Sequence, residues 1–136
     1  MLTWLKQIFT WWNGQTLNTR FHTWRNGELV GHDEFGNAYY QTKGGKLDPA
    51  LGYCRRWVIY AGLSEGSKTP PGWYGWLHYQ SDVAPTSENY EPRDWQLPYQ
   101  PNLTGTPLAY RPSGSTLAEA ARPSATGDYK AWQPGN

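Results

Sequence analysis

The residues of this chain that are best suited to chemistry lie together in the segment GHDEFGNAYYQT, residues 31–42. Histidine, aspartate and glutamate follow one another as His32, Asp33 and Glu34, a set that suits a metal ion or an acid–base pair. The same segment also suits a turn, because Asp and Asn bond to nearby backbone and Gly accepts a positive φ. The first interpretation is catalytic and the second is structural.

The supply of ligands favours the structural interpretation. The other His and Cys residues of the chain are His22, His78 and Cys54. None of them forms a C-x-x-C or H-x-x-x-H pattern, and His32 and Asp33 would point to opposite faces of a strand. We therefore predict no catalytic residue, no bound cofactor and no metal. The residues predicted to form a structural turn are Asp33, Gly36 and Asn37.

Other chemical patterns are weak. Cys54 precedes Arg55 and Arg56, which favour a thiolate, but no histidine lies beside it in the sequence to act as a base. We expect Cys54 to be a small packing residue and one of the two arginines to stack on a ring or pair with a carboxylate. The chain has no G-x-G-x-x-G or P-loop pattern and a formal net charge of only +1, so nothing supports nucleotide or nucleic-acid binding.

The composition predicts one small domain packed on aromatic rings. The chain has 136 residues, 9 Trp and 16% aromatic residues, together with 15 Gly and 11 Pro that indicate much irregular backbone. A single cysteine excludes an internal disulfide and favours a reducing compartment. The first fourteen residues show no export signal and are too short to span a bilayer.

The elements that would position these residues follow from the pattern of apolar side chains. Leu5, Ile8, Phe9 and Trp12 have helical spacing, so a short helix is expected over residues 2–12, ending at the Asn13–Gly14 pair. Alternating residues predict strands of an antiparallel sheet, with a hairpin turn at Asn26–Gly27. The expected strands are residues 20–25, 28–33, 38–42 and 55–60, the last of them central.

A second short helix is expected to begin at Thr69–Pro70–Pro71 and to end near Gln80. Its residues Trp73, Trp76 and Leu77 would cover one face of the sheet. The predicted fold class is α+β and mostly irregular: a small antiparallel sheet of three to four strands, a short N-terminal helix, a second short helix and a long extended C-terminal tail.

Three regions are predicted. Residues 1–14 form an N-terminal amphipathic helix, residues 15–96 a small sheet domain, and residues 97–136 an extended proline-rich tail without sustained periodicity. Isolated rings in such a tail do not form a core, so we expect the tail to lie along a partner. The predicted partner-binding residues are Trp4, Trp11, Trp12, Tyr99, Pro101, Asn102, Thr104, Gly105, Tyr110 and Trp132.

Several segments, taken in order, resemble a known family. They are GHDEFGNAYYQ (31–41), RRWVIY (55–60), PPGWYGWLHY (70–79), YQPNLTGTPLAYRP (99–112) and YKAWQP (129–134). The chain resembles the alpha-subcomplex subunit 12 family of respiratory complex I, the NADH:ubiquinone oxidoreductase. It departs from the family at Gln41, where Glu is usual, and at Cys54, where another residue is commoner.

The resemblance implies a non-catalytic accessory subunit of the peripheral arm, without cofactors of its own. Its partners would be core and accessory subunits of that arm, including iron–sulfur subunits near the quinone site, and its N-terminal helix would contact the membrane surface. The implied location is the cytoplasmic face of a bacterial inner membrane, or the matrix face in a mitochondrion. A related assembly factor shares the front segments but not the tail segments, so the tail favours the subunit.

Two functions of other classes remain as alternatives. An aromatic-rich β domain can stack sugars, as a carbohydrate-binding module does, although such modules are normally secreted. A small metal-dependent enzyme would use His32, Asp33 and His78, for which the number of ligands is too low.

Overall fold

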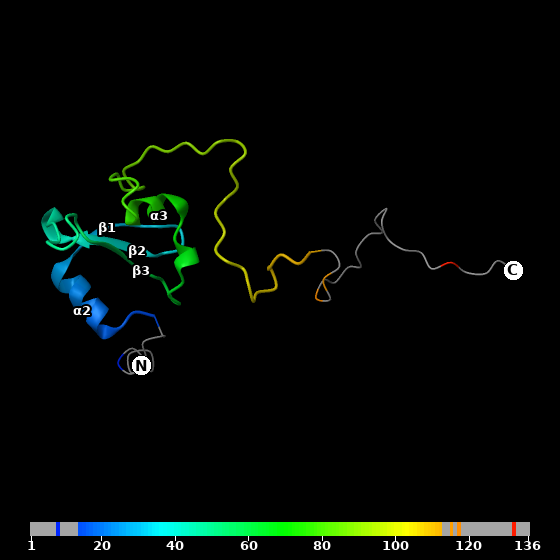
Figure 1. Cartoon of the computed structure of the whole chain (residues 1–136), viewed down its shortest axis with the longest axis horizontal. Helices are drawn as coiled ribbons and strands as arrows, with labels where there is room; N and C mark the ends of the chain where they lie inside the picture. The colour runs from blue at the N-terminus through cyan, green and yellow to red at the C-terminus, as the bar shows by residue number, and fades with distance from the viewer. Residues whose placement is uncertain (1–7, 9–13, 113–114, 116, 118–131, 133–136) are drawn as a thin grey trace. The chain divides into compact units, whose positions relative to one another are not determined.

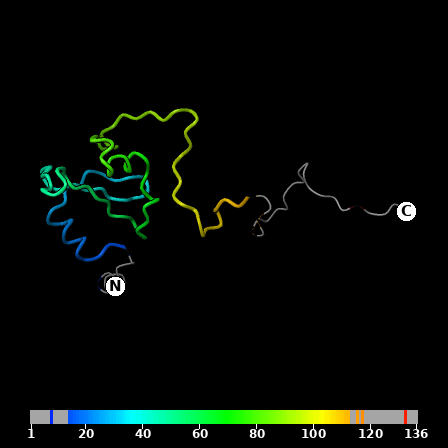
Figure 2. Tube along the Cα trace, viewed as in Figure 1, coloured from blue at the N-terminus to red at the C-terminus, as the bar shows by residue number. Residues whose placement is uncertain are grey.

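A three-stranded antiparallel sheet with a short helix on each face forms the ordered centre of the molecule (Figure 1). The computed structural model describes residues 8, 14–112, 115, 117 and 132. The chain divides into two compact units, Met1–Asn102 and Leu103–Asn136. All the helices and strands named below belong to the first unit, and the path of its chain can be followed in Figure 2.

The sheet confirms the predicted fold class. Its strands are β1 (Gly27–His32), β2 (Ala38–Thr42) and β3 (Arg56–Ile59), in the spatial order β1-β2-β3. β1 and β2 pair from Gly27 opposite Thr42 to His32 opposite Ala38, with a bulge between Leu29 and Gly31. The strands expected near residues 28–33, 38–42 and 55–60 are confirmed. The last of them was expected to be central, but β3 is an edge strand and β2 is the central one.

The prediction of a strand over residues 20–25 is wrong. These residues belong to the helix α2 (Leu17–Asn26), whose cap residue Thr16 accepts a hydrogen bond at its side chain from the Thr19 backbone N–H at 3.2 Å. The short alternation of polar and apolar residues fits a helix as well, because Phe21 and Trp24 are three positions apart and share one side.

The Asn26–Gly27 pair is accordingly the end of a helix and not a hairpin turn. Gly27 has an extended φ of −90°, so positive φ does not explain the glycine. A Cβ atom at Gly27 would lie 2.5 Å from the Thr23 carbonyl oxygen and 2.9 Å from the Trp57 ring. A glycine is needed here because the helix passes too close to β3 for any side chain.

The second predicted helix is confirmed as α3 (Pro71–Leu77), which begins one residue later than expected, with Pro70 as its cap, and ends before Gln80. The predicted apolar side of this helix forms the core. The Trp73 ring stacks on Tyr39 of β2 with centroids 3.9 Å apart, and Trp76 meets Trp73 edge-on at 5.6 Å. Tyr39, Trp73 and Trp76 are 0%, 3% and 1% exposed, so aromatic rings do fill the centre.

Two further short helices are of the 3-10 type, η1 (Lys43–Gly45) and η2 (Gly66–Lys68). Of the predicted helix over residues 2–12, only Ile8 lies among the described residues, and it is helical. The described part of the second unit contains turns, such as the one in which the Thr106 N–H donates to the Leu103 carbonyl at 3.0 Å. The partition into residues 1–14, 15–96 and 97–136 stays a prediction.

The segment of residues 33–37 is the turn between β1 and β2. Asp33 Oδ1 accepts hydrogen bonds from the backbone N–H groups of Phe35 and Asn37, both at 2.9 Å. Its Oδ2 accepts from the Asn37 side-chain amide and from the Tyr39 hydroxyl, both at 2.8 Å. Gly36 has a φ of +80°, whereas the φ of Asn37 is not positive.

Asn37 also fastens the turn to two distant parts of the chain. Its Nδ2 donates to the Lys68 carbonyl at 2.9 Å, and its Oδ1 accepts from the Ala61 N–H at 2.9 Å. The side chain is fully buried. Burial, followed by the hydrogen bond to Asp33, raises the pKa of Tyr39 far above its usual value, so the Tyr39 hydroxyl remains a proton donor.

Replacement of Asn37 by alanine should lower the free energy of unfolding by about 2–4 kcal/mol, since it removes a fully buried amide together with its hydrogen bonds to Lys68, Ala61 and Asp33. Urea denaturation followed by tryptophan fluorescence measures the loss. Glu34→Ala, at an exposed position of the same turn, is the control and should change the free energy by less than about 0.5 kcal/mol. Equal losses in the two variants would contradict the role given to Asn37.

Gly36→Val should cost about 1–3 kcal/mol, because a β-branched residue is strained at a φ of +80°. A Cβ atom at this position meets only the Ala61 Cβ at 3.6 Å, an ordinary contact, so the loss comes from the backbone. Gly36→Asn is the matched control, because Asn tolerates this conformation better. A thermal unfolding temperature that falls equally in both variants would rule out this explanation.

Candidate partner-binding surfaces

The face of the sheet opposite α3 carries an exposed apolar surface, formed by Phe21 and Trp24 of α2 and Leu29 of β1. Trp24 and Leu29 line a pocket there, and the Phe21 ring centroid lies 5.8 Å from that of Trp24. Trp24 is 75% exposed, Phe21 56% and Leu29 51%. The pocket has a volume of about 470 Å³ and reaches inward to Tyr40 and Ile59. We call these five residues the α2 surface. Exposed aromatic side chains beside an open pocket are a feature of protein interfaces.

Trp57 fixes the position of α2 against the sheet. Its indole N–H donates to the Thr23 hydroxyl at 3.0 Å, its ring meets His22 edge-on at 5.4 Å, and it stacks with Tyr40 at 6.2 Å. These contacts lie on the face opposite the Tyr39–Trp73 stack, because adjacent strand residues point to opposite sides. α2 is therefore held by polar and ring contacts, and its large apolar side chains remain outside the core.

Lys43 sets the charge at the end of α2. Its ammonium group donates to the carbonyl oxygens of Trp24 at 3.2 Å and Arg25 at 3.0 Å, where the helix has unpaired acceptors. The bond to Trp24 uses the backbone, so the indole ring of Trp24 is independent of it. The Lys43 ammonium thus binds the backbone at the end of α2, while the Trp24 ring remains exposed.

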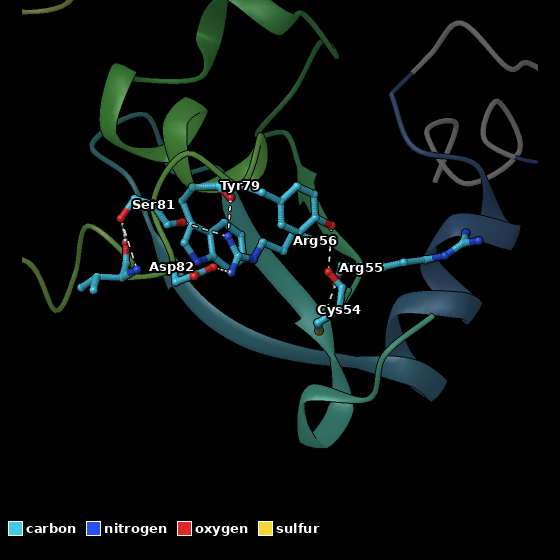
Figure 3. A network of polar contacts seen from close by, with 8 residues as sticks. Cys54, Arg55, Arg56, Tyr79, Ser81 and Asp82 are labelled. Carbon is cyan, nitrogen blue, oxygen red and sulfur yellow. Dashed lines mark hydrogen bonds and ion pairs between the residues drawn. The ribbon is translucent and has the colours of Figure 1, made fainter. Parts of the chain in front are cut away.

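A second cluster surrounds the buried guanidinium of Arg56 (Figure 3). Arg56 lies 4.7 Å from the centroids of both Trp76 and Tyr79, and donates to the carbonyl oxygens of Trp76 at 2.7 Å and Ser81 at 2.9 Å. It also pairs with Asp82 at 2.8 Å. This cluster holds the end of α3 and the following segment against β3, a structural task. Both arginines pair with a carboxylate, since Arg55 pairs with Asp48 at 2.5 Å.

Cys54 is half-buried at the start of β3, opposite Leu47 in an isolated β-bridge. Its Sγ lies 3.7 Å from the Thr42 carbonyl oxygen. No group of three or more His, Cys, Asp or Glu residues that could hold a metal ion occurs in the described part of the chain. Asp33 is occupied by the turn, and His32 is exposed.

The segment after α3 returns to η2 at Ser67. The Tyr99 hydroxyl donates to the Ser67 carbonyl, and the Asn102 N–H donates to the Ser67 hydroxyl at 3.1 Å. The Tyr99 ring also meets Phe35 edge-on at 6.3 Å. Residues 99–102 are thus joined to the turn that follows β1, and Tyr99 is half-buried by its own chain.

The other predicted partner-binding residues differ in their surroundings. Tyr110 and Trp132 are 90% and 79% exposed, Thr104 is exposed, and Gly105 forms a turn at a φ of +82°. Pro101 is half-buried. Trp4, Trp11 and Trp12 lie outside the described residues. No contact with a partner tests any of these assignments, so they stay predictions.

Sequence reasoning did not find the α2 surface, because Phe21 and Trp24 were assigned to a strand. Thr16 and Thr19 carried the signal that could have revealed it, since a Thr at the start of a helical spacing is a good cap.

Comparison with known proteins identifies relatives of this chain. The family described as NADH ubiquinone oxidoreductase subunit NDUFA12 matches residues 27–134. The chain belongs to this family. The match begins at the first residue of β1 and includes all three strands and α3.

Individual relatives of the chain come from distant organisms. A probable NADH dehydrogenase [ubiquinone] 1 alpha subcomplex subunit 12 from Arabidopsis thaliana is 33% identical over 127 residues, 90% of this chain and 76% of the plant protein. The subunit 12 of Bos taurus is 36% identical over 103 residues, 68% of this chain and 67% of the bovine protein. An uncharacterized protein of Rickettsia prowazekii is 43% identical over 67 residues, 49% of this chain and 63% of the bacterial protein.

Members of this family are accessory subunits of complex I, which agrees with a non-catalytic protein. None of the helices in the described ranges is long and apolar enough to cross a bilayer.

Arg56→Lys should lower the free energy of unfolding by about 1–3 kcal/mol, because an ammonium cannot bond the carbonyl oxygens and stack on both rings as the planar guanidinium does. Asp82→Asn is the control. The Asp82 side chain is 91% exposed, so the loss of its ion pair should cost less than about 1 kcal/mol. If Asp82→Asn destabilised the protein as much as Arg56→Lys in urea denaturation, the ion pair would be the main contact.

Proposed function

We propose that this chain is a non-catalytic accessory subunit of a proton-pumping NADH:ubiquinone oxidoreductase, which stabilises the peripheral arm near the quinone module and supports assembly of the complex. The observation that carries the proposal is the family match over residues 27–134. The relatives from Arabidopsis and Bos taurus are named as subunits of this enzyme.

The α2 surface supports a role in binding other proteins. Its rings Phe21 and Trp24 are exposed, and Trp24 lines a pocket that is open to solvent. Aromatic side chains contribute much of the free energy of binding at interfaces, because they bury a large area and lose little conformational freedom. We propose that this surface contacts a subunit of the peripheral arm.

The tail is proposed to add further contacts. Tyr110 and Trp132 are almost fully exposed in the described part of the second unit. Spaced rings in a proline-rich segment suit an extended mode of binding along a larger surface. The proposed partners are core and accessory subunits, iron–sulfur subunits near the quinone site among them, with the predicted N-terminal helix at the membrane surface. The proposed location is the cytoplasmic face of a bacterial inner membrane or the matrix face in a mitochondrion.

The experiment is a purification of the tagged chain from membranes solubilised in mild detergent, followed by mass spectrometry and an assay of NADH:ubiquinone oxidoreductase activity. Subunits of the complex and its activity should co-purify with the chain. Recovery of the chain alone, or with proteins unrelated to the complex, would overturn the proposal.

Trp24→Ala should weaken retention of the chain on the complex by about 2 kcal/mol, as expected for an aromatic anchor. The free chain should keep its stability to within about 1 kcal/mol, because the ring is 75% exposed. Trp95→Ala, at a 73% exposed ring outside the α2 surface, is the matched control. Equal retention of the two variants in quantitative pull-downs would exclude the α2 surface as the binding site.

A further inference from the structure

The outer edge of β3 presents backbone groups that the sheet does not use. The Thr42 N–H donates to the Arg55 carbonyl at 3.0 Å, which makes these residues a hydrogen-bonded pair of β2 and β3. Hydrogen-bonded and non-bonded pairs alternate in an antiparallel ladder, so Trp57 also bonds to β2, whereas Arg56 and Val58 turn their N–H and C=O groups outward. Among the described residues the Arg56 carbonyl and both backbone groups of Val58 have no hydrogen-bond partner, whereas the Arg56 N–H faces the Tyr79 hydroxyl.

Side chains of the protein close this edge at both ends. On one side of the open stretch, the Tyr79 hydroxyl donates to the outward carbonyl of Cys54 at 2.7 Å, as Figure 3 shows. On the other side, the Gln15 side-chain amide donates to the carbonyl of Tyr60 at 2.7 Å. The carbonyl groups of Cys54 and Tyr60 point outward like those of Arg56 and Val58, because these four residues alternate with the residues that bond to β2. The fold therefore satisfies the edge except between these two side chains.

A groove runs along the open stretch. It has a volume of about 590 Å³ and is lined by α2, by β3 itself and by single residues of two loops. The lining residues are Asn18, Thr19, His22, Leu51, Arg55, Arg56, Trp57, Val58 and Tyr79. Since part of the floor is the strand edge, an extended peptide in the groove would meet the backbone groups of Arg56 and Val58.

The ionisable side chains of this groove, apart from the tyrosine, are those of His22, Arg55 and Arg56, with no carboxylate among the lining residues. Arg55 is 55% exposed and bonds to Asp48 through Nε, which leaves its two terminal nitrogens without a partner in the described part of the chain. A carboxylate on the incoming peptide would pair with these nitrogens. A second copy of this chain would instead bring arginine against arginine.

We propose that an extended segment of a partner polypeptide, with an aspartate or glutamate near Arg55, adds a fourth strand to the sheet at Arg56 and Val58. In an antiparallel addition, one partner residue exchanges both backbone hydrogen bonds with Val58, and the residue two positions away donates its N–H to the Arg56 carbonyl. This inference rests on the proposed function, because the partner is a subunit of the same complex.

Hydrogen exchange resolved at single amides tests the proposal in the full-length chain. In the free chain, the amide hydrogens of Trp57 and Ile59 should be protected by the ladder, whereas that of Val58 should exchange fast. In the purified complex, exchange at Val58 should slow by at least about tenfold. This change would report a new backbone hydrogen bond at the outward N–H of Val58.

Each other outcome overturns the proposal. Fast exchange at Val58 within the complex would leave the proposed function intact but rule out the added strand. Protection in the free monomer would mean that the chain covers its own edge, and protection that grows with protein concentration would indicate a second copy. If the chain does not co-purify with the complex at all, the proposed function is overturned, and the strand addition that rests on it is overturned as well.

A pair of variants at one position gives an independent test. Val58→Pro removes the outward N–H but no bond to β2, and proline is tolerated on edge strands when its nitrogen faces outward. Val58→Ala keeps that N–H and loses comparable packing against the core. Retention of Val58→Pro on the complex should be about tenfold weaker than that of Val58→Ala. Equal retention of two folded variants, checked by the protection of Trp57 and Ile59, would overturn the proposal.

Discussion

The buried amide of Asn37 is the constraint on which the remaining structure depends. It joins the turn after β1 to the segment two residues beyond β3 and to the η2 segment, through Asp33, Ala61 and Lys68. A buried amide without these partners would be strongly unfavourable, so each of the three segments is held at a defined place. Ser67 lies next to Lys68 and receives Tyr99 and Asn102, so the returning segment depends indirectly on the same side chain.

The size of the core explains why so many rings face outward. The fully buried ring cluster consists of Tyr39, Trp73 and Trp76, and each such ring buries about 150–250 Å² of surface. That is little for a domain of this length, and one further face of the sheet is covered only by α2. Because α2 buries Thr23 and leaves Phe21 and Trp24 exposed, the protein keeps apolar area that a partner can cover.

The sequence was sufficient for the elements whose pattern is strong and local. The turn at 33–37, the strand β2 and the Trp73–Trp76 side of α3 follow from glycine and asparagine chemistry, alternation and helical spacing. The sequence was insufficient to predict the structure of residues 20–27. A short alternation of polar and apolar residues fits both a strand and a helix, and the Asn–Gly pair can end a helix as well as form a hairpin. The close approach of α2 to Trp57, which decides the matter, is a tertiary contact that no local pattern contains.

The candidate surfaces likewise combine one feature that the sequence predicted with one that it did not. That one of the two arginines would pair or stack was expected, but the outward series from Cys54 to Tyr60 depends on the pairing register of β2 and β3, which the sequence does not specify. Tyr79 adopts a φ of +58°, an unfavourable conformation for a residue with a side chain, while its ring stacks on Arg56 and its hydroxyl reaches the Cys54 carbonyl. These contacts compensate for the backbone strain at one end of the groove, and Gln15 closes the other end with a single amide. A sheet whose last strand is closed by side chains on both sides of an open stretch differs from one that simply ends, since the unpaired groups of Arg56 and Val58 are confined to the length of a short added strand.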